Sequence, residues 1–172
     1  AKTLPGIFFE QSRKFVENPL FWSKKDGYWE GISWQDASAQ VKKLASLLML
    51  CGISKGDRVL IASENRPEWS ISDLAIMSIG AIVVPAYTSN TEEDNSYLLS
   101  HSKAKLAITS GGNVASRLCL AADSNKEIKN IILIDAKPEN FSVKDCNLLS
   151  WDEEMRKIDI DDKIEKEIVK IS

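Results

Sequence analysis

The chain has 172 residues, 44% of them apolar and 27% charged, with a formal net charge of -3. That length suits one domain, and the proportions are ordinary for a globular protein. No basic stripe of the kind found in nucleic-acid binders is present, so we expect no nucleic-acid partner. The longest apolar run, residues 74–86, is interrupted by Ser78, Gly80 and Pro85. It is shorter than the roughly 18 residues of a membrane helix, so we expect no transmembrane segment.

The cysteines and the N-terminal residues indicate the cellular compartment of the protein. Cys51, Cys119 and Cys146 are far apart and odd in number. They have neither metal-ligand spacing nor the pattern of a disulfide framework, so we expect reduced, partly buried thiols. The first 14 residues have no long apolar core and no small-residue cleavage site, which argues against a signal peptide. These features predict a cytoplasmic protein, and association with a membrane surface is compatible with them.

The first predicted elements are a β-hairpin and a helix. In the run 20–33, two aromatic-rich segments flank the Lys-Asp-Gly turn at 25–27, and Asp-Gly is a strong tight-turn signal. Ser33 then caps a helix, with Asp36 as the return half of a capping box. Gly52 ends this helix, where a left-handed residue is needed. Apolar residues at helical spacing predict its buried face: Ala37, Val41, Leu44, Ala45 and Leu48.

A β-α-β unit with a right-handed crossover is predicted next. Residues 59–62 form a short apolar strand, Asn65 caps the following helix, and Pro67 lies in its first turn. Gly80 ends the helix, and residues 81–85 form a second strand. Their continuous Ile/Val run is typical of a strand buried on both sides of a parallel sheet. The expected apolar face of the helix is Ile71, Leu74, Ala75, Ile79 and Ile82.

The same alternation continues to about residue 135. A helix capped at Thr91 has an acidic first turn that suits the helix dipole. A strand at 105–110, a helix at 113–124 and a strand at 128–135 follow. This order predicts an α/β fold: a doubly wound, mostly parallel sheet with flanking helices and an N-terminal β-hairpin. From Trp151 the composition becomes sharply charged, and we expect one amphipathic helix followed by a chain end with no evident core role.

One segment is a candidate phosphate loop: Thr109-Ser110-Gly111-Gly112-Asn113, between a predicted strand and a predicted helix. Phosphate binding uses backbone N–H groups left free by a Gly-rich turn, usually with a cation nearby. The segment lacks the glycine spacing and the lysine of a P-loop. An ordinary strand-to-helix turn is therefore the favoured interpretation.

The remaining polar and aromatic candidates have structural interpretations. His101 is the only histidine, and no Gly-x-Ser-x-Gly elbow accompanies it, so we interpret it as a structural or surface residue. Trp34 and Trp69 lie just inside helix starts and are expected to be packing anchors. Adjacent carboxylates are interpreted as solvated helix faces: Glu92-Glu93-Asp94, Glu153-Glu154 and Asp161-Asp162. The residues alone therefore assign no catalytic, cofactor-binding or metal-binding position.

Three segments carry motifs in a familiar order. ISWQDASAQ has an aliphatic residue, a Ser, an aromatic residue and an acidic residue opening a helix. GISKGDRVLIASENRPEW contains Gly-Ile-x-x-Gly-Asp-x-Val and then Asn-x-x-Glu-Trp. Residues 76–109 contain Gly-Ala-x-x-Val-Pro, the helix after it and a Ser-x-Ala-Lys tail. In order and spacing these segments resemble the N-terminal portion of the adenylate-forming (AMP-binding) acyl-CoA synthetases, and most of all the long-chain fatty-acid–CoA ligases. The resemblance covers residues 1–150.

This resemblance implies a two-step ligase in the full-length protein. A fatty-acid carboxylate attacks the α-phosphate of ATP, and the thiol of coenzyme A then displaces AMP. ATP, Mg²⁺ and coenzyme A are the implied cofactors. The family's phosphate loop, roughly Tyr-Thr-Ser-Gly-Thr-Thr-Gly-x-Pro-Lys-Gly, occurs nowhere in this chain. The segment 109–111 matches three of its letters only and falls too early in the motif order.

We therefore expect a catalytically incomplete fragment that holds no cofactor by itself. Residues 1–150 are predicted to be an N-terminal α/β subdomain of a larger synthetase domain, and residues 151–172 a charged segment leading toward the missing loop. The implied partners are a fatty-acid substrate and the remainder of the polypeptide, which would cover an apolar face exposed here. A homodimer and peripheral membrane contact are compatible with this interpretation.

Two other interpretations stay open from the sequence. One is a ligase for aryl or medium-chain acids, or a peptide-synthetase adenylation domain. The Asn-Arg-Pro-Glu-Trp helix start favours the fatty-acid branch over this group. The other is a non-catalytic α/β binding module.

Overall fold

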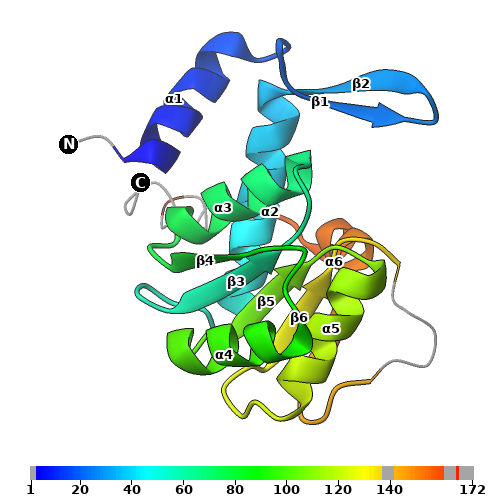
Figure 1. Ribbon diagram of the computed structural model, residues 1–172. Coiled ribbons are helices and arrows are strands. Elements are labelled where there is room, and N and C mark those ends of the chain that lie inside the picture. Colours follow the sequence, from blue (N-terminus) through cyan, green and yellow to red (C-terminus); the bar gives the residue numbers. More distant parts are fainter. Residues whose placement is uncertain (1–2, 137–141, 161–165, 167–172) are drawn as a thin grey trace.

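A five-stranded parallel sheet forms the centre of the computed structural model, which describes residues 3–136, 142–160 and 166 (Figure 1). The strands lie in the order β4-β3-β5-β6-β7, and every neighbouring pair is parallel. Their bounds are β3 Arg58–Ala62, β4 Ile82–Ala86, β5 Leu106–Thr109, β6 Asn130–Leu133 and β7 Asn147–Ser150. The predicted mostly parallel sheet is confirmed.

Helices cover both faces of this sheet. One apolar core lies between the sheet and α1, α2, α3 and α6, and a second core lies between the opposite face and α4 and α5. Side chains alternate along each strand, so Val59 and Ile61 enter the first core and Leu60 enters the second. The helices are α1 Leu4–Phe15, α2 Trp34–Leu50, α3 Pro67–Ser78, α4 Glu92–Ser102, α5 Gly112–Asp123 and α6 Trp151–Lys157. The doubly wound arrangement is therefore confirmed.

The N-terminal hairpin consists of β1 (Pro19–Lys25) and β2 (Tyr28–Ser33), which pair antiparallel. Asp26 and Gly27 have φ angles of 49° and 88°, the left-handed values that a two-residue hairpin turn requires. The hairpin was predicted and is confirmed. α2 follows at once, with the predicted Ser33 cap accepting a hydrogen bond from the Asp36 N–H at 3.0 Å. Each residue of its predicted apolar face is fully buried.

The start of α3 differs from the prediction. Arg66, and not Asn65, occupies the N-cap position, because Pro67 is the first helical residue. Proline suits that position since its missing N–H has no intrahelical partner there. No side chain caps this helix end. The extended backbone of Arg66 instead lets its long side chain reach the end of the sheet.

β4 also differs from the prediction, because it is an edge strand and is not buried on both sides. The chain returns from β4 to place β5 on the far side of β3, which leaves one edge of β4 unpaired among the described residues. Ile82, expected on the face of α3, begins β4 and is 50% exposed. Pro85 is tolerated because an edge strand has backbone groups outside the ladder. An apolar run by itself did not distinguish an edge strand from a central one.

Sequence patterns missed two elements and one core residue. α1 was not predicted, although Phe8 and Phe9 bury its inner face. β7 was not predicted either, because its four residues, Asn147–Ser150, show only a short apolar signal. Ile158, beyond α6, is buried in the first core, so the expectation of a chain end with no core role is wrong at this residue. The predicted division between residues 150 and 151 stays a prediction.

Candidate functional site

The sheet has a topological switch point between β3 and β5. β4 lies on one side of β3, and the later strands lie on the other side. In open parallel sheets, ligands bind in the crevice outside the carboxyl ends of the strands at such a point. The segments that leave these strands are therefore the place to look for functional groups. They are residues 63–66 after β3, 110–111 after β5 and 134–135 after β6.

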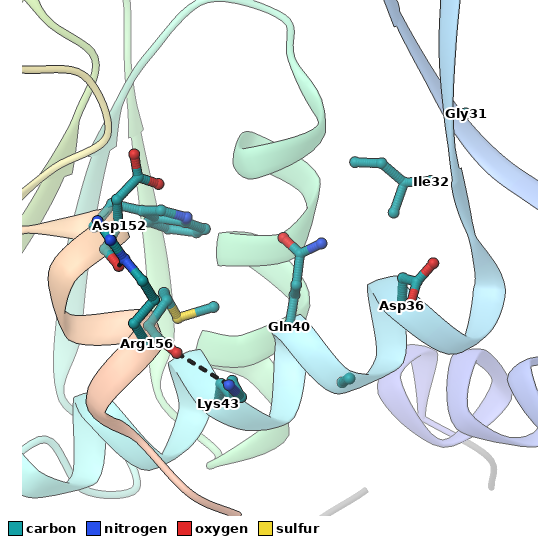
Figure 2. A pocket seen from close by; sticks show the side chains of 10 residues that line it. Gly31, Ile32, Asp36, Gln40, Lys43, Asp152 and Arg156 are labelled. Atoms are coloured by element: carbon teal, nitrogen blue, oxygen red, sulfur yellow. Dashed lines mark hydrogen bonds between the residues drawn. The ribbon is translucent and has the colours of Figure 1, made fainter.

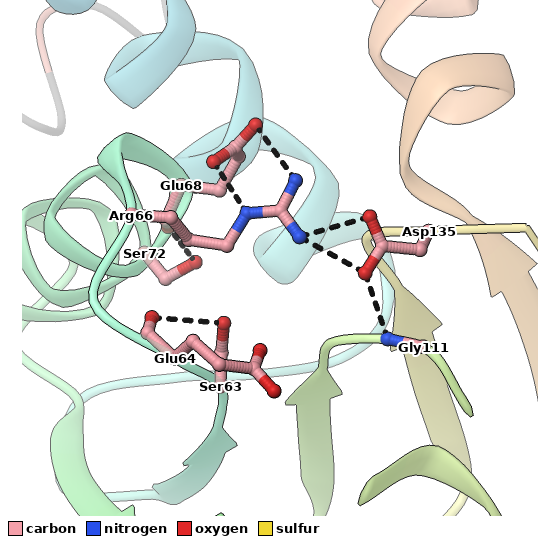
Figure 3. A network of polar contacts seen from close by, with 7 residues as sticks. All are labelled: Ser63, Glu64, Arg66, Glu68, Ser72, Gly111 and Asp135. Carbon is pink, nitrogen blue, oxygen red and sulfur yellow. Dashed lines mark hydrogen bonds and ion pairs between the residues drawn. The ribbon is translucent and has the colours of Figure 1, made fainter. Parts of the chain in front are cut away.

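A network centred on Arg66 ties these segments together (Figure 3). The Arg66 Nε donates to Glu68 Oε2 at 2.8 Å. Its Nη1 donates to both oxygens of Asp135, at 2.8 and 2.9 Å. The same Asp135 carboxylate accepts a hydrogen bond from the Gly111 N–H at 2.8 Å. The N-terminal end of α3 and the carboxyl ends of β5 and β6 are thus joined through two side chains.

The charge of Arg66 is committed to this network. Burial lowers the pKa of Arg66, but its hydrogen bonds and ion pairs with Glu68 and Asp135 outweigh burial and raise the pKa above the ordinary value. Bidentate arginine–carboxylate pairs are among the stronger charge-assisted hydrogen bonds. The guanidinium is therefore held as a structural cation and is not available as a free phosphate ligand.

The Gly-rich segment 109–113 is occupied by the protein itself. The Gly111 N–H at the start of α5 binds Asp135, so a carboxylate already lies where a phosphate would be attracted. A Cβ placed on Gly111 would approach the Asp135 Cβ to 2.8 Å, so this close approach requires glycine. The hydroxyls of Thr109 and Ser110 are buried and have no hydrogen-bond partner among the described residues. This geometry fits an ordinary strand-to-helix turn and does not fit the phosphates of ATP.

A cleft of about 880 Å³ lies between the hairpin and this end of the sheet. Trp22 and Trp29 line it from the hairpin, together with Lys24 and Lys25. The opposite wall is polar and carries the Arg66 network. Its main members are Arg66, Glu68, Asp135, Trp151 and Asp152.

A second cleft of about 600 Å³ lies between α2 and α6 (Figure 2). Asp36, Gln40 and Lys43 face it from α2, and Asp152 and Arg156 face it from α6. The Lys43 ammonium donates to the Met155 carbonyl at 3.1 Å and holds the two helices together. Within residues 3–136, 142–160 and 166, no group of three or more His, Cys, Asp or Glu is placed to hold a metal ion.

The other residues considered from sequence lie apart from these clefts or serve packing. His101 stacks on Tyr97 on the surface of α4, with ring centroids 5.4 Å apart. Trp34 stacks on Phe8 at 5.8 Å, and Trp69 packs against the first core. Acidic residues fill the first turns of α4 and α6: Glu92, Glu93, Asp94, Glu153 and Glu154. Asp161 and Asp162 lie outside the described residues.

Sequence reasoning missed Asp135, which links Arg66 to the Gly111 N–H in this network. The available signal was its position, because it is the last residue of the strand predicted at 128–135 in a parallel sheet. Residues there lie at the edge where ligand-binding groups gather. Its partner Arg66 was noted only as part of the Asn-Arg-Pro-Glu-Trp motif, and no ion pair was predicted for it.

Comparison with known proteins identifies the family. The model of the AMP-binding enzyme family matches residues 8–166, so the chain belongs to that family. It is 28% identical over 135 residues to the long-chain-fatty-acid–CoA ligase FadD15 of Mycobacterium tuberculosis. It is 32% identical over 115 residues to fatty acyl-CoA synthetase A of Dictyostelium discoideum. These alignments span 78% and 67% of this chain but only 22% and 17% of the relatives.

Solved structures show the same fold. The coronafacic acid ligase of Pectobacterium brasiliense superposes with a TM-score of 0.77 over 92% of this chain and 30% of that protein, at 22% identity. A benzoate CoA ligase of Burkholderia xenovorans gives a TM-score of 0.72 over 88% of this chain and 28% of its own, at 18% identity. The fold is therefore that of one part of an adenylate-forming ligase. None of the described helices is both long and apolar enough to cross a bilayer.

Proposed function

We propose that this chain is the N-terminal scaffold of an acid–CoA ligase that activates long-chain fatty acids with ATP, Mg²⁺ and coenzyme A. The supporting observation is the family match over residues 8–166, together with the fatty-acid ligases among the relatives. The chain spans about a fifth of the length of those relatives. Its own part in the reaction is structural. The Arg66–Asp135 network and the two cores stabilise this α/β part of the larger ligase domain.

The chain by itself is expected neither to bind Mg-ATP tightly nor to form an acyl-adenylate. Its Gly-rich segment is occupied by Asp135, and its best-placed arginine is paired with two carboxylates. Isothermal calorimetry with Mg-ATP, and pyrophosphate release with a long-chain fatty acid, measure both properties. Micromolar affinity or pyrophosphate release above a no-enzyme control would contradict this proposal.

The substrate class is tested on a longer chain that includes the sequence downstream of Ser172 in its gene. Pyrophosphate release is measured with palmitate, octanoate and benzoate at equal concentrations. Long-chain ligase activity predicts the highest kcat/KM for palmitate. Preference for benzoate or octanoate would favour an aryl or medium-chain ligase, and a gene that ends at Ser172 would favour a non-catalytic module.

A further inference from the structure

A groove between α1 and α2 lies apart from the two clefts described above. It has a volume of about 330 Å³, and apolar residues such as Phe9, Val16 and Ala39 line it. Among the described residues, the charged side chains that line the groove are Arg13 and Lys42, and both are cationic. An apolar groove with a cationic rim is complementary to an apolar surface that carboxylates border.

The chain itself enters this groove after α6. The hydrogen bond from the Lys43 ammonium to the Met155 carbonyl fixes α6 against α2. Ile158 is then buried in the first core, Asp159 is exposed, and Ile160 lines the groove. The residues after Ile160 therefore begin inside the groove, and they reach the rest of it without a long loop.

These following residues have the pattern of a short amphipathic helix. Residues 161–165 and 167–172 lie outside the described part of the chain, but Lys166 is helical and exposed. Successive residues of a helix are rotated by about 100°. Ile164, Ile168 and Ile171 therefore lie within about 40° of the direction opposite Lys166. A helix that exposes Lys166 presents this isoleucine stripe to the surface on which it packs.

The charges of the segment agree with the same orientation. Glu165 and Glu167 lie at about 100° on either side of Lys166, so they border the isoleucine stripe. Lys163 and Lys170 lie on the same side as Lys166. With the stripe in the groove, the carboxylates meet the cationic rim and the ammonium groups face the solvent.

We propose that residues 161–172 dock in the groove between α1 and α2 as a short helix, with the isoleucine stripe facing inward. Packing of an apolar helical face into a groove is a common mode of peptide recognition. A helix this short is marginal in water by itself, so helical structure at Lys166 depends on packing. Residues 162–171 would form a helix of about 15 Å, close to the roughly 18 Å of the 12-residue α1.

The docked segment clamps α1 onto α2 and fixes the path of the chain after α6. The occupant of the groove is a part of this chain, because Ile160 already lies in the groove and connects to the segment directly. This docking does not depend on ligase chemistry, so either proposal can fail without the other.

The test is hydrogen–deuterium exchange of the 172-residue chain, measured by mass spectrometry in the peptide that covers residues 161–172. The double variant Ile164→Ser/Ile168→Ser removes most of the stripe. Val169→Ser is the matched control, because this residue lies about 60° from Lys166 and outside the stripe. Peptides from β3 and β5 show in each variant whether the central sheet is retained.

The wild-type chain and Val169→Ser are expected to exchange in residues 161–172 about tenfold or more slowly than an unfolded peptide of the same sequence. Their rates should agree within about twofold. The stripe variant is expected to exchange at nearly the rate of the unfolded peptide, while the sheet stays protected. Unprotected exchange in the wild-type chain would overturn the proposal. So would protection that survives loss of the stripe, an equal loss in Val169→Ser, or protection that depends on protein concentration, which would indicate a second copy as the occupant.

Charge variants test the groove without altering either core. Glu165→Lys/Glu167→Lys places cations against the cationic rim, so faster exchange of the segment is expected. Adding Arg13→Glu, at an exposed rim position, should slow that exchange again, because opposite charges then face each other. A combined variant that exchanges no more slowly than the carboxylate variant would contradict docking beside Arg13. If the stripe variant also loses protection of the sheet, this comparison decides the proposal.

Discussion

At the residue scale, Asp57 shows a structural role for the aspartate of the Gly-Ile-x-x-Gly-Asp-x-Val motif. Its carboxylate accepts hydrogen bonds from the Ser54 N–H and hydroxyl, both at 2.9 Å, and pairs with the Lys105 ammonium at 2.8 Å. Asp57 is only 7% exposed and lies just before β3, while Lys105 lies just before β5. The ionised side chain therefore joins two neighbouring strands at their amino ends. The Lys105 hydrogen bond, opposed by burial and aided by Ser54, holds the pKa of Asp57 below its ordinary value of 3.8.

This lowered pKa predicts a pH-dependent contribution to stability. Since ionised Asp57 is favoured in the folded state, its contribution is fully present above pH 3.8 and is lost as the pH falls through the lower folded pKa. We expect Asp57→Asn to lower the free energy of unfolding by about 1–3 kcal/mol at pH 7. Urea unfolding of both proteins at pH 7 and pH 2.5 should show this difference shrinking at the lower pH. A difference of the same size at both values would contradict this role.

The same scale shows why two carboxylates of similar sequence context behave differently. Both oxygens of Asp135 accept hydrogen bonds, from Arg66 and from the Gly111 N–H, whereas Asp152 forms no ion pair within residues 3–136, 142–160 and 166 and lines two clefts. The difference comes from what lies across the sheet edge and not from neighbours in sequence.

At the element scale, caps and turns account for much of the fold. Ser33 ends β2 and begins α2 with a single residue, because its extended backbone suits the strand and its hydroxyl oxygen binds the Asp36 N–H. α4 begins in a similar way, at a capping box made by Thr91 and Asp94. Both caps depend only on residues within three positions of each other, so the sequence was enough to predict them. The N-terminus of α3 has Pro67 as its first residue and no side-chain cap. The local cap signal of Asn65 therefore placed the start of this helix one residue too early.

We expect removal of the α2 cap to destabilise the whole domain, since the buried face of α2 is part of the first core. Ser33→Ala should lower the free energy of unfolding by about 1 kcal/mol. Ser33→Thr keeps a hydroxyl that can accept from the Asp36 N–H and donate to the Asp36 carboxylate, and is the matched control, expected to lose much less. Equilibrium urea unfolding measures both variants. Equal losses in the alanine and threonine variants would show that the cap hydrogen bond is not the cause.

At the scale of the whole molecule, α6 links the last described segment to the first core. Trp151 is 5% exposed and Met155 is also buried, and the Lys43 ammonium bonds the Met155 carbonyl. The sequence predicted an amphipathic helix from Trp151, and α6 is that helix, but the charged composition also predicted no core role for the residues after it. The apolar residues are few, but they lie on the one helical face that meets α2 and the sheet.

Replacing Trp151 should therefore cost far more than replacing an exposed tryptophan. We expect Trp151→Ala to lower the free energy of unfolding by about 3–5 kcal/mol, the usual range for a buried aromatic. Trp29→Ala, on the exposed hairpin, should change it by less than about 1 kcal/mol. Thermal and urea unfolding compare the two variants. A small effect of Trp151→Ala would indicate that α6 is not an integral part of this core.

Local sequence signals were sufficient for the hairpin turn, the helix caps at Ser33 and Thr91, the buried face of α2 and the α/β alternation. Each depends on backbone geometry or on a periodicity that neighbouring residues set by themselves. Tertiary structure alone decided that β4 lies at the edge, that Ile158 is buried and that Asp135 closes the Gly-rich turn. Those outcomes depend on strand order and on contacts between residues far apart in the chain, such as Arg66 with Asp135, and no local pattern specifies which distant segment will be the neighbour.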